Sequence, residues 1–150
     1  LETRKWFDQQ GFIETETPLM VKAPSPEAQF SLMQVHGETR ENKNLPQKPE
    51  AFLITSPEYQ MKRMLVGGFE KIFQICRCFR NGEIGPLHHP EFTMLEWYRA
   101  HGSLRDVMND VTQLFRYLST NVSGTFPITD QSWPILKVRD FFQVVGPNRA

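Results

Sequence analysis

The sequence predicts an α+β domain in which an antiparallel sheet is flanked by helices. Two runs of alternating side chains, Lys71–Arg80 and Glu91–Arg99, are separated by a segment rich in glycine and proline, and this pattern indicates a long antiparallel hairpin. The residues after Ser103 instead repeat apolar side chains with helical spacing. A length of 150 residues corresponds to about one domain.

The composition argues against a DNA-binding protein and against a membrane protein. Seventeen Lys and Arg residues balance 17 Asp and Glu residues, whereas a non-specific grip on nucleic acid needs a surplus of basic side chains. No stretch approaches the roughly 20 apolar residues of a membrane span, and the start of the chain is too polar for a signal peptide. We therefore expect a cytoplasmic protein that binds neither DNA nor a membrane.

The first part of the chain predicts a helix followed by short strands. A helical pattern over Leu1–Gln10 ends at Gly11, which tolerates a positive φ. Alternation over Phe12–Thr17 predicts a strand that ends at Pro18, because proline cannot donate to a strand ladder. A second short strand is expected at Phe30–Val35, within an otherwise polar loop.

A further strand and a helix precede the hairpin. Ala51–Thr55 is a short apolar run and predicts a strand. Ser56 is expected to cap the next helix, with Pro57 at its first helical position, where the missing N–H costs nothing. This helix is expected to end at Gly67 and Gly68.

The alternation within the hairpin assigns its polar and aromatic side chains to one face. On that face the first strand presents Ile72, Gln74, Cys76, Cys78 and Arg80, and the second presents Phe92, Met94, Glu96 and Tyr98. The turn at Asn81–Pro90 joins the two strands. We expect the guanidinium, the phenyl ring, the carboxylate and the phenol of this face to share one cleft.

The chain has two cysteines, Cys76 and Cys78. Their spacing is neither the C-x-x-C of a redox pair nor half of a zinc site, and we expect no metal site. Side chains two residues apart on a strand point the same way. We therefore expect two reduced thiols, as in a reducing cytoplasm.

The clearest helix begins at Ser103, where Asp106 completes a capping box. Its apolar stripe is interpreted as ordinary core and consists of Leu104, Val107, Met108, Val111, Leu114, Phe115 and Leu118. Further along, Trp133–Leu136 predicts a strand and Val138–Val145 predicts a short amphipathic helix.

The side chains on the hairpin face suit a nucleotide and a cationic ligand. Arg80 carries a fixed planar cation that suits a phosphate oxygen, and Phe92 offers a ring on which a base can stack. Glu96 and Tyr98 can take up a cationic side chain, and Glu58, at the start of the preceding helix, is a further carboxylate that can meet an amine. Each residue also has a simpler explanation, such as a surface charge or an interaction with the helix dipole. A purely structural hairpin is therefore an alternative.

Two segments resemble sequence motifs of the class II aminoacyl-tRNA synthetases. Residues 11–18, Gly-Phe-Ile-Glu-Thr-Glu-Thr-Pro, resemble motif 1 of that family. Phe79-Arg80-Asn81 together with residues 90–96, Pro-Glu-Phe-Thr-Met-Leu-Glu, resemble motif 2 in its lysyl, aspartyl and asparaginyl version. Residues 56–59 and 95–99 are similar to the lysyl-tRNA synthetase paralogues that attach lysine or β-lysine to elongation factor P.

The resemblance covers nearly the whole chain and implies a partial class II aminoacyl-tRNA synthetase catalytic fold. Residues 1–150 would form the N-terminal part of the catalytic domain, with motifs 1 and 2 present and motif 3 absent. The implied activity is ATP-dependent activation of lysine or β-lysine as an adenylate and its transfer to a lysine of elongation factor P. ATP and Mg²⁺ are the implied cofactors, with the magnesium ligands outside this chain, and the motif 1 region would form a homodimer interface.

The resemblance also implies roles for individual residues. Arg80 would be the catalytic residue, which binds the α-phosphate of ATP and the carboxylate of the substrate. The substrate would be bound by Ser56, Glu58, Glu96 and Tyr98. The nucleotide would be bound by Arg80, Asn81, Gly82, His88, His89 and Phe92, with the ring of Phe92 stacked on adenine.

The turn of motif 2 departs from the family pattern in three places. Gly82 stands where the family has a glutamate, Pro86 and Leu87 stand where it has a basic residue, and His89 replaces its asparagine. These changes concern ATP handling and leave the lysine pocket intact. Two alternatives follow: a fragment of a lysyl-tRNA synthetase, and a catalytically degenerate paralogue with a binding or regulatory role. The zero net charge favours a protein acceptor over tRNA but leaves tRNA binding open.

Because motif 3 is absent from residues 1–150, we expect this chain by itself not to catalyse adenylation. The measurement is ATP–pyrophosphate exchange in the presence of lysine or β-lysine, with the full-length protein as the positive control. Sustained exchange by residues 1–150 alone would contradict this expectation.

Overall fold

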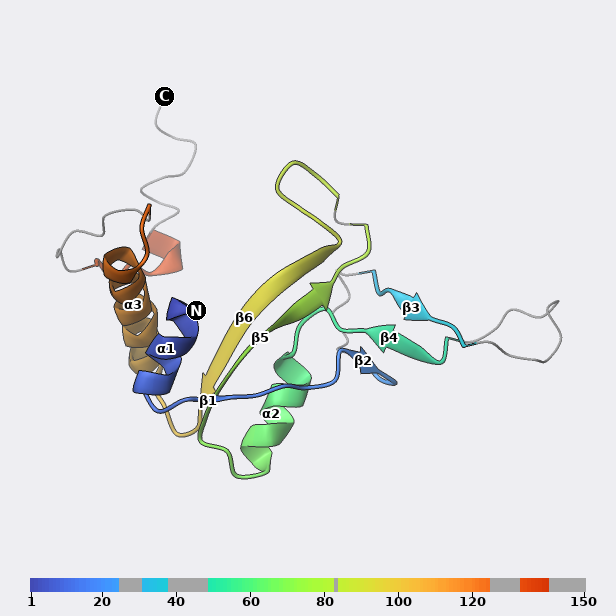
Figure 1. Cartoon of the computed structure of the whole chain (residues 1–150), viewed down its shortest axis with the longest axis horizontal. Helices are drawn as coiled ribbons and strands as arrows, with labels where there is room; N and C mark the ends of the chain where they lie inside the picture. The colour runs from blue at the N-terminus through green and yellow to red at the C-terminus, as the bar shows by residue number, and fades with distance from the viewer. Residues whose placement is uncertain (25–30, 38–48, 83, 125–132, 141–150) are drawn as a thin grey trace, which may run out of the picture.

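The protein is described here by a computed structural model, which describes residues 1–24, 31–37, 49–82, 84–124 and 133–140. Three helices and two three-stranded sheets are present in these residues (Figure 1). In chain order the elements are α1 (Glu2–Gln9), β1 (Ile13–Glu14), β2 (Met20–Val21), β3 (Gln34–Val35), β4 (Ala51–Leu53), α2 (Glu58–Val66), β5 (Lys71–Phe79), β6 (Glu91–Arg99) and α3 (Leu104–Asn121). The mixture of helices and small sheets is compatible with a partial class II synthetase fold.

The larger sheet is built on the predicted hairpin. β5 and β6 pair antiparallel over their whole length, from Lys71 opposite Arg99 to Phe79 opposite Glu91. β1 lies on the other side of β5 and runs parallel to it, with Ile13 opposite Ile72. The prediction of an antiparallel sheet is therefore wrong for β1. Alternation reveals a strand but not its direction, and here the long connection between β1 and β5 permits a parallel pairing.

The smaller sheet has the order β2-β4-β3 and is antiparallel throughout. Its strands are shorter than the sequence suggests: β4 covers three residues of the expected Ala51–Thr55, and β3 covers Gln34–Val35 of the expected Phe30–Val35. Phe30 itself lies outside the described residues. A strand extends only as far as a neighbouring strand pairs with it. The sequence of one strand does not show how long its partner strand is.

Two further strand predictions are corrected in the same way. Of Phe12–Thr17, only Ile13–Glu14 belongs to the ladder, although the backbone N–H of Thr15 still donates to the Phe73 carbonyl at 2.8 Å. Trp133–Leu136 has no strand, because none of the described strands lies against it as a ladder partner. Val138–Asp140 is helical as predicted, and the rest of Val138–Val145 lies outside the described residues.

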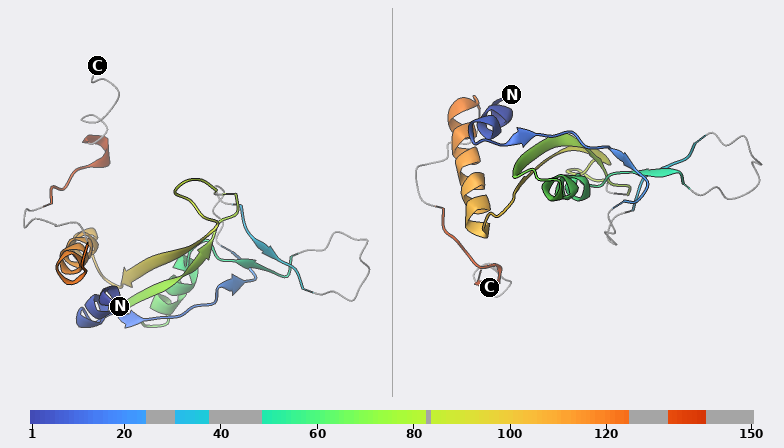
Figure 2. Two further views of the ribbon diagram at one scale, coloured as in Figure 1. Left: turned by 45° about the horizontal axis from the view of Figure 1, so that its top comes forward. Right: turned by 90° about the horizontal axis from the view of Figure 1, so that it is seen from below.

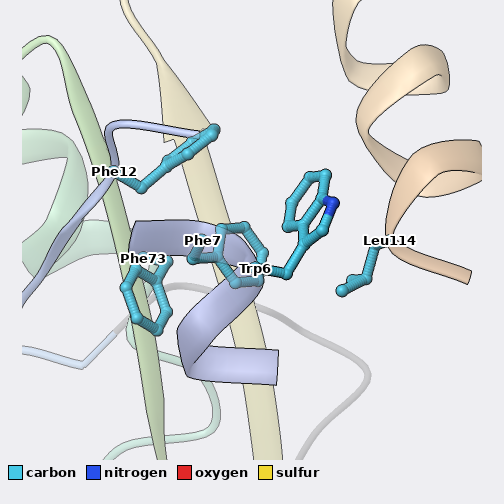
Figure 3. Packing of buried hydrophobic residues seen from close by; sticks show 5 residues of the cluster. All are labelled: Trp6, Phe7, Phe12, Phe73 and Leu114. Atoms are coloured by element: carbon cyan, nitrogen blue, oxygen red, sulfur yellow. The ribbon is translucent and has the colours of Figure 1, made fainter. Parts of the chain in front are cut away.

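An aromatic core packs against one face of the hairpin (Figure 3). Phe7 of α1 stacks on Phe73 of β5 with ring centroids 4.5 Å apart, and Phe12 meets Phe7 edge-on at 5.1 Å. Trp6 of α1 and Leu114 of α3 complete the buried cluster, against which Ile75, Leu95 and Trp97 pack. Aromatic pairs of this geometry contribute about 1 kcal/mol each beyond the area that they bury. The core therefore holds α1 against the face opposite to that of the predicted site.

α2 covers the other face of the hairpin, so the sheet lies between α1 and α2 (Figure 2). Met61 is fully buried on the inner side of α2. The helix begins at Glu58 with Pro57 at the N-cap position, and the first backbone bond runs from the Met61 N–H to the Pro57 carbonyl. Ser56 is therefore not the cap as predicted, because it lies one residue before the cap position and makes no capping hydrogen bond.

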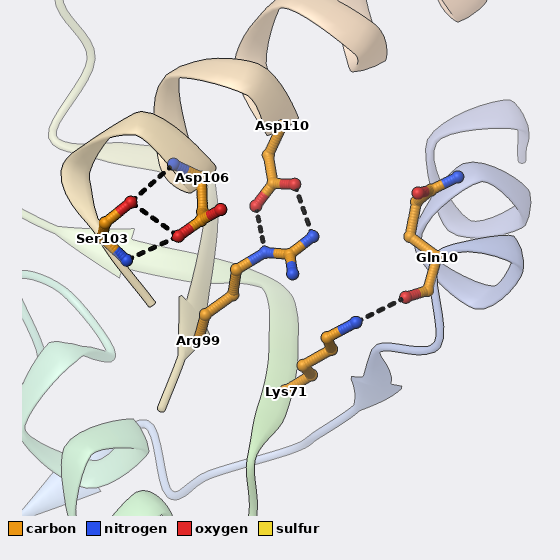
Figure 4. A network of polar contacts seen from close by, with 6 residues as sticks. All are labelled: Gln10, Lys71, Arg99, Ser103, Asp106 and Asp110. Atoms are coloured by element: carbon orange, nitrogen blue, oxygen red, sulfur yellow. Dashed lines mark hydrogen bonds and ion pairs between the residues drawn. The ribbon is translucent and has the colours of Figure 1, made fainter. Parts of the chain in front are cut away.

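α3 begins at Ser103 with the predicted capping box, in which Ser103 and Asp106 exchange side-chain and backbone hydrogen bonds (Figure 4). Its apolar stripe is only partly core. Leu114 is buried, whereas Leu104 and Phe115 are 76% and 50% exposed. The correction has a geometric reason: α3 packs against α1, where Leu114 joins the aromatic cluster, and the neighbouring side of the stripe is uncovered in the described structure.

A buried ion pair fixes the base of the hairpin to α3 (Figure 4). The guanidinium of Arg99, at the end of β6, donates two hydrogen bonds of 2.6 Å to the carboxylate of Asp110, which is 2% exposed. The same guanidinium lies 5.0 Å from the ring centroid of Phe12. The guanidinium of Arg99 on β6 therefore contacts both α3 and the segment that follows α1.

We expect Arg99→Met to lower the free energy of unfolding by about 3 kcal/mol, because removing one partner leaves a buried carboxylate without its counter-charge. Urea denaturation followed by circular dichroism measures the change. Arg4→Met is the matched control: Arg4 pairs with Glu14 at an exposed site, so its loss is expected to cost less than about 1 kcal/mol. Equal destabilisation by the two variants would contradict the role of the Arg99–Asp110 pair.

Candidate functional site

The register of the hairpin places the predicted functional side chains on one face. Phe92 lies opposite Cys78, Glu96 lies opposite Gln74, and Tyr98 lies opposite Ile72. Residues opposite one another in an antiparallel pair share a face. This face is the one turned away from the aromatic core, as the alternation predicts. Phe92 and Tyr98 are six residues apart, which corresponds to roughly 20 Å along the strand.

At the turn end of this face a guanidinium lies over an aromatic ring. Arg80 follows directly after β5, and its guanidinium carbon is 5.2 Å from the ring centroid of Phe92. The backbone N–H of Arg80 donates to the Pro90 carbonyl at 2.9 Å, which closes the hairpin at this point. The ring face therefore accepts a flat cation and is accessible to a planar group. Such a pair can hold an anion beside a stacked ring.

The other end of the face carries a carboxylate and a phenol. The Tyr98 hydroxyl donates to the Glu96 carboxylate at 2.8 Å. Burial raises the pKa of Tyr98 above its ordinary value, and the hydrogen bond to Glu96 and the negative charges of Glu96 and Glu58 raise it further. Tyr98 thus remains a neutral donor, and the Glu96 carboxylate accepts its hydrogen bond.

Glu58 joins this end from α2. It is the first residue of the helix, and its charge acts on Tyr98. The ammonium of Lys62, one helical turn later, forms an ion pair with Glu58. The pKa of Lys62 is raised by the hydrogen bond with Glu58 and, to a smaller extent, by the charge of Glu96. The structure therefore brings together two carboxylates, one phenol and one resident ammonium.

Lys62 is the member of this cluster that the sequence analysis missed. The signal was present, because an acidic residue four positions before a lysine on a helix is a favourable pair. Its side chain is 55% exposed. An alkylammonium is therefore already paired with Glu58, and a cationic ligand would compete with it for this carboxylate.

The remaining predicted site residues are more dispersed. The Ser56 hydroxyl is buried and has no hydrogen-bond partner among the described residues. Asn81 pairs through its backbone with Ser31, and Gly82 adopts a φ of +81°, which favours glycine at this turn. His88 and His89 lie exposed in the turn.

No metal centre is apparent in the described part of the chain. Among residues 1–24, 31–37, 49–82, 84–124 and 133–140, no three His, Cys, Asp or Glu side chains converge on one point. The same residues contain no helix that is both long and apolar enough to cross a bilayer. The described side chains therefore provide no preformed set of three metal ligands.

We expect Glu96→Gln to lower the pKa of Tyr98 toward its ordinary value of about 10, because the substitution removes the negative charge that disfavours the phenolate. NMR titration of ¹³Cζ-labelled tyrosine resolves Tyr98 from the two other tyrosines. Glu14→Gln, which removes an exposed carboxylate on the opposite face, is expected to leave the titration of Tyr98 unchanged. An unchanged titration in Glu96→Gln would contradict the proximity of the two groups.

Comparison with known proteins identifies relatives of this chain. Residues 1–147 match the family described as "tRNA synthetases class II (D, K and N)". Two curated proteins, from Mannheimia succiniciproducens and Haemophilus ducreyi, are each 42% identical to it over 121 residues, which is 78% of this chain and 35% of each relative. Both are named "Elongation factor P--(R)-beta-lysine ligase". The chain thus spans about a third of the length of these relatives.

Proposed function

Since the chain belongs to the class II tRNA synthetase family of the D, K and N type, we propose that the protein containing it is an ATP-dependent ligase. In this proposal it activates lysine or β-lysine as an adenylate and transfers the acyl group to a lysine of elongation factor P. The observation that carries the proposal is the single sheet face on which a guanidinium–ring pair and a carboxylate–phenol pair lie at opposite ends.

The charges on this face complement lysine. The substrate carries two ammonium groups and one carboxylate. The face offers the carboxylate of Glu96 and the guanidinium of Arg80, and α2 adds the carboxylate of Glu58. In the proposal, Glu96 and Tyr98 hold the distal ammonium and Glu58 holds the amine near the carboxylate. Ser56, buried between β4 and α2, lines the substrate pocket.

The reaction would occur at the turn end of the face. A carboxylate oxygen of the substrate attacks the α-phosphorus of ATP, the bond to the bridging oxygen breaks, and pyrophosphate leaves. Arg80 stabilises the negative charge that develops on the phosphoryl oxygens, and Phe92 stacks on adenine. An amine of the acceptor lysine then attacks the acyl carbon and AMP leaves. Asn81, Gly82, His88 and His89 line the nucleotide side of the turn in this proposal.

The acceptor is proposed to be a protein rather than tRNA. The relatives from two bacteria carry the name of an elongation factor P ligase, and the chain has no surplus of basic residues for a tRNA backbone. The reaction is therefore proposed to take place in the cytoplasm, where translation factors act. The magnesium ions of the proposed reaction would be held by residues outside the described ones.

The motif 1 region is proposed to form a homodimer interface. Three apolar side chains near Pro18, those of Ile13, Leu19 and Met20, are 54%, 36% and 55% exposed. Exposed apolar side chains grouped in this way are typical of surfaces that bind another protein. A second copy of the chain would cover them.

A second candidate function is a catalytically degenerate paralogue that binds lysine without activating it. The altered turn of motif 2 favours this alternative, because Gly82, Pro86 and Leu87 replace the residues that the family uses near the triphosphate. Leu87 is 93% exposed and offers no charge to a phosphate. Binding of lysine without binding of ATP would distinguish the degenerate paralogue from the ligase.

Two substitutions in the full-length protein test the proposal by calorimetry. We expect Glu96→Gln to raise the Kd of lysine or β-lysine by about tenfold to a hundredfold, because one hydrogen bond to a charged group is lost. The Kd of ATP is expected to remain unchanged. Phe92→Leu is expected to raise the Kd of ATP by about tenfold through loss of base stacking, with lysine binding unchanged. Glu14→Gln is the control for both. Failure of the wild-type protein to bind either ligand would refute the proposed function.

A further inference from the structure

The proposed function leaves the two cysteines of the hairpin face unused. Cys76 and Cys78 are both reduced, and their sulfurs lie 3.9 Å apart, close enough for one thiol to donate to the other. They differ in accessibility. Cys78 is fully buried, whereas Cys76 is partly exposed and lines a cavity of about 430 Å³ together with Thr15 and Glu16. Cys76 is therefore the more accessible residue of the two.

The surroundings also give the two thiols different pKa values. The hydrogen bond from Cys78 lowers the pKa of Cys76 to about 7, and a smaller contribution comes from Gln74. The pKa of Cys78 is raised, chiefly by that same hydrogen bond and by burial. Near pH 7 Cys76 is therefore partly ionised, whereas Cys78 remains a buried thiol. This is the arrangement of an attacking cysteine with a resolving neighbour.

We propose that Cys76 and Cys78 form an oxidation site that a hydroperoxide converts into a disulfide within β5. The Cys76 thiolate attacks the terminal oxygen of the hydroperoxide, the O–O bond breaks, and the leaving alkoxide or hydroxide takes up a proton. The resulting sulfenic acid on Cys76 is attacked by the Cys78 sulfur, which forms the S–S bond and releases water. Overall, two thiols lose two electrons and two protons, and one hydroperoxide becomes an alcohol, or water, and a second water.

The strand geometry makes this disulfide easy to reduce again. Residues two apart on a strand have Cα atoms about 6.6 Å apart, near the upper end of the disulfide range of about 4.4–6.8 Å. Closing the sulfurs from 3.9 Å to a bond therefore shortens β5 between the two residues. Strained disulfides have high reduction potentials and are typical of regulatory sites rather than of structural ones.

The distortion would fall within the candidate site. Cys78 is paired with Phe92 and Cys76 with Met94, and the ring of Phe92 carries the guanidinium of Arg80. Shortening of β5 at this point displaces Phe92 relative to Arg80. Oxidation is therefore expected to weaken nucleotide binding reversibly. This consequence rests on the proposed function, whereas formation of the disulfide is independent of it.

The sequence makes the disulfide directly detectable. Trypsin cleaves after Lys71, Arg77 and Arg80, so Cys76 and Cys78 fall in separate peptides, residues 72–77 and 78–80. After treatment of the full-length protein with stoichiometric hydrogen peroxide at pH 7, mass spectrometry under non-reducing conditions is expected to detect these two peptides joined. Dithiothreitol is expected to separate them. Absence of the joined peptide, with Cys76 converted to sulfinic acid instead, would overturn the proposal.

Two variants assign the roles of the two sulfurs. In Cys78→Ala, the sulfenic acid on Cys76 is expected to persist and to react with dimedone. In Cys76→Ser, oxidation of Cys78 is expected to be slower by about tenfold or more, because the accessible thiolate is gone. Thermal melting verifies that both variants are folded. Equal rates in Cys76→Ser and wild type would overturn the assignment of Cys76 as the attacking residue.

A binding measurement separates this inference from the proposed function. Calorimetry with ATP is expected to give at least a tenfold higher Kd for oxidised than for reduced wild type, and no change on peroxide treatment of Cys76→Ser. If the joined peptide forms while the reduced protein binds no ATP, the proposed function fails and the oxidation site stands. If the joined peptide forms and ATP binding is unchanged by oxidation, the proposed effect on the site is refuted.

Discussion

The nine-residue register between β5 and β6 is the constraint on which the rest of the structure depends. A slip of one residue would move every side chain of one strand to the opposite face. Glu96 would then point into the aromatic core and Trp97 would point to the site. The stack of Phe7 on Phe73, against which Trp97 packs, makes such a slip costly. The packing of the aromatic core on one face of the hairpin therefore fixes the position of the site on the opposite face.

The two ends of the hairpin are held in different ways. At the base, Arg99 is paired with the buried carboxylate of Asp110 of α3 and lies over Phe12, so that β6, α3 and the segment after α1 contact one cation. At the other end, the turn after Arg80 is exposed, with Ile84 and Leu87 directed to solvent. The carboxylate–phenol pair therefore lies on the firmly held part of the hairpin and the guanidinium–ring pair near its exposed end. In the proposed function, the firmly held end of the hairpin would bind the amine-containing end of the substrate.

Three kinds of functional group lie on one sheet face, because period-two alternation places every second residue of each strand on that face. Carboxylate and phenol lie near the base, the two thiols lie in the middle, and guanidinium and phenyl ring lie near the turn. α2 adds Glu58 and Lys62 from outside the hairpin. In the proposed oxidation, the change in the middle of β5 would act on the guanidinium–ring pair through the shared backbone, without a contact between the thiols and a ligand.

The sequence by itself determined the local features: the end of α1 just before Gly11, the capping box of Ser103, the hairpin, and the face shared by Arg80, Phe92, Glu96 and Tyr98. These features depend on the chemistry of residues close together in the sequence and on the alternation of side chains along a strand. Both can be recognised in the sequence alone. Only the tertiary structure decided that β1 runs parallel to β5, that three of the seven apolar side chains of the α3 stripe are exposed, and that the pair of Glu58 and Lys62 lies near Glu96. The physical reason is that pairing direction, burial and long-range charge depend on segments far apart in the sequence, and no local pattern contains the identity of the distant partner.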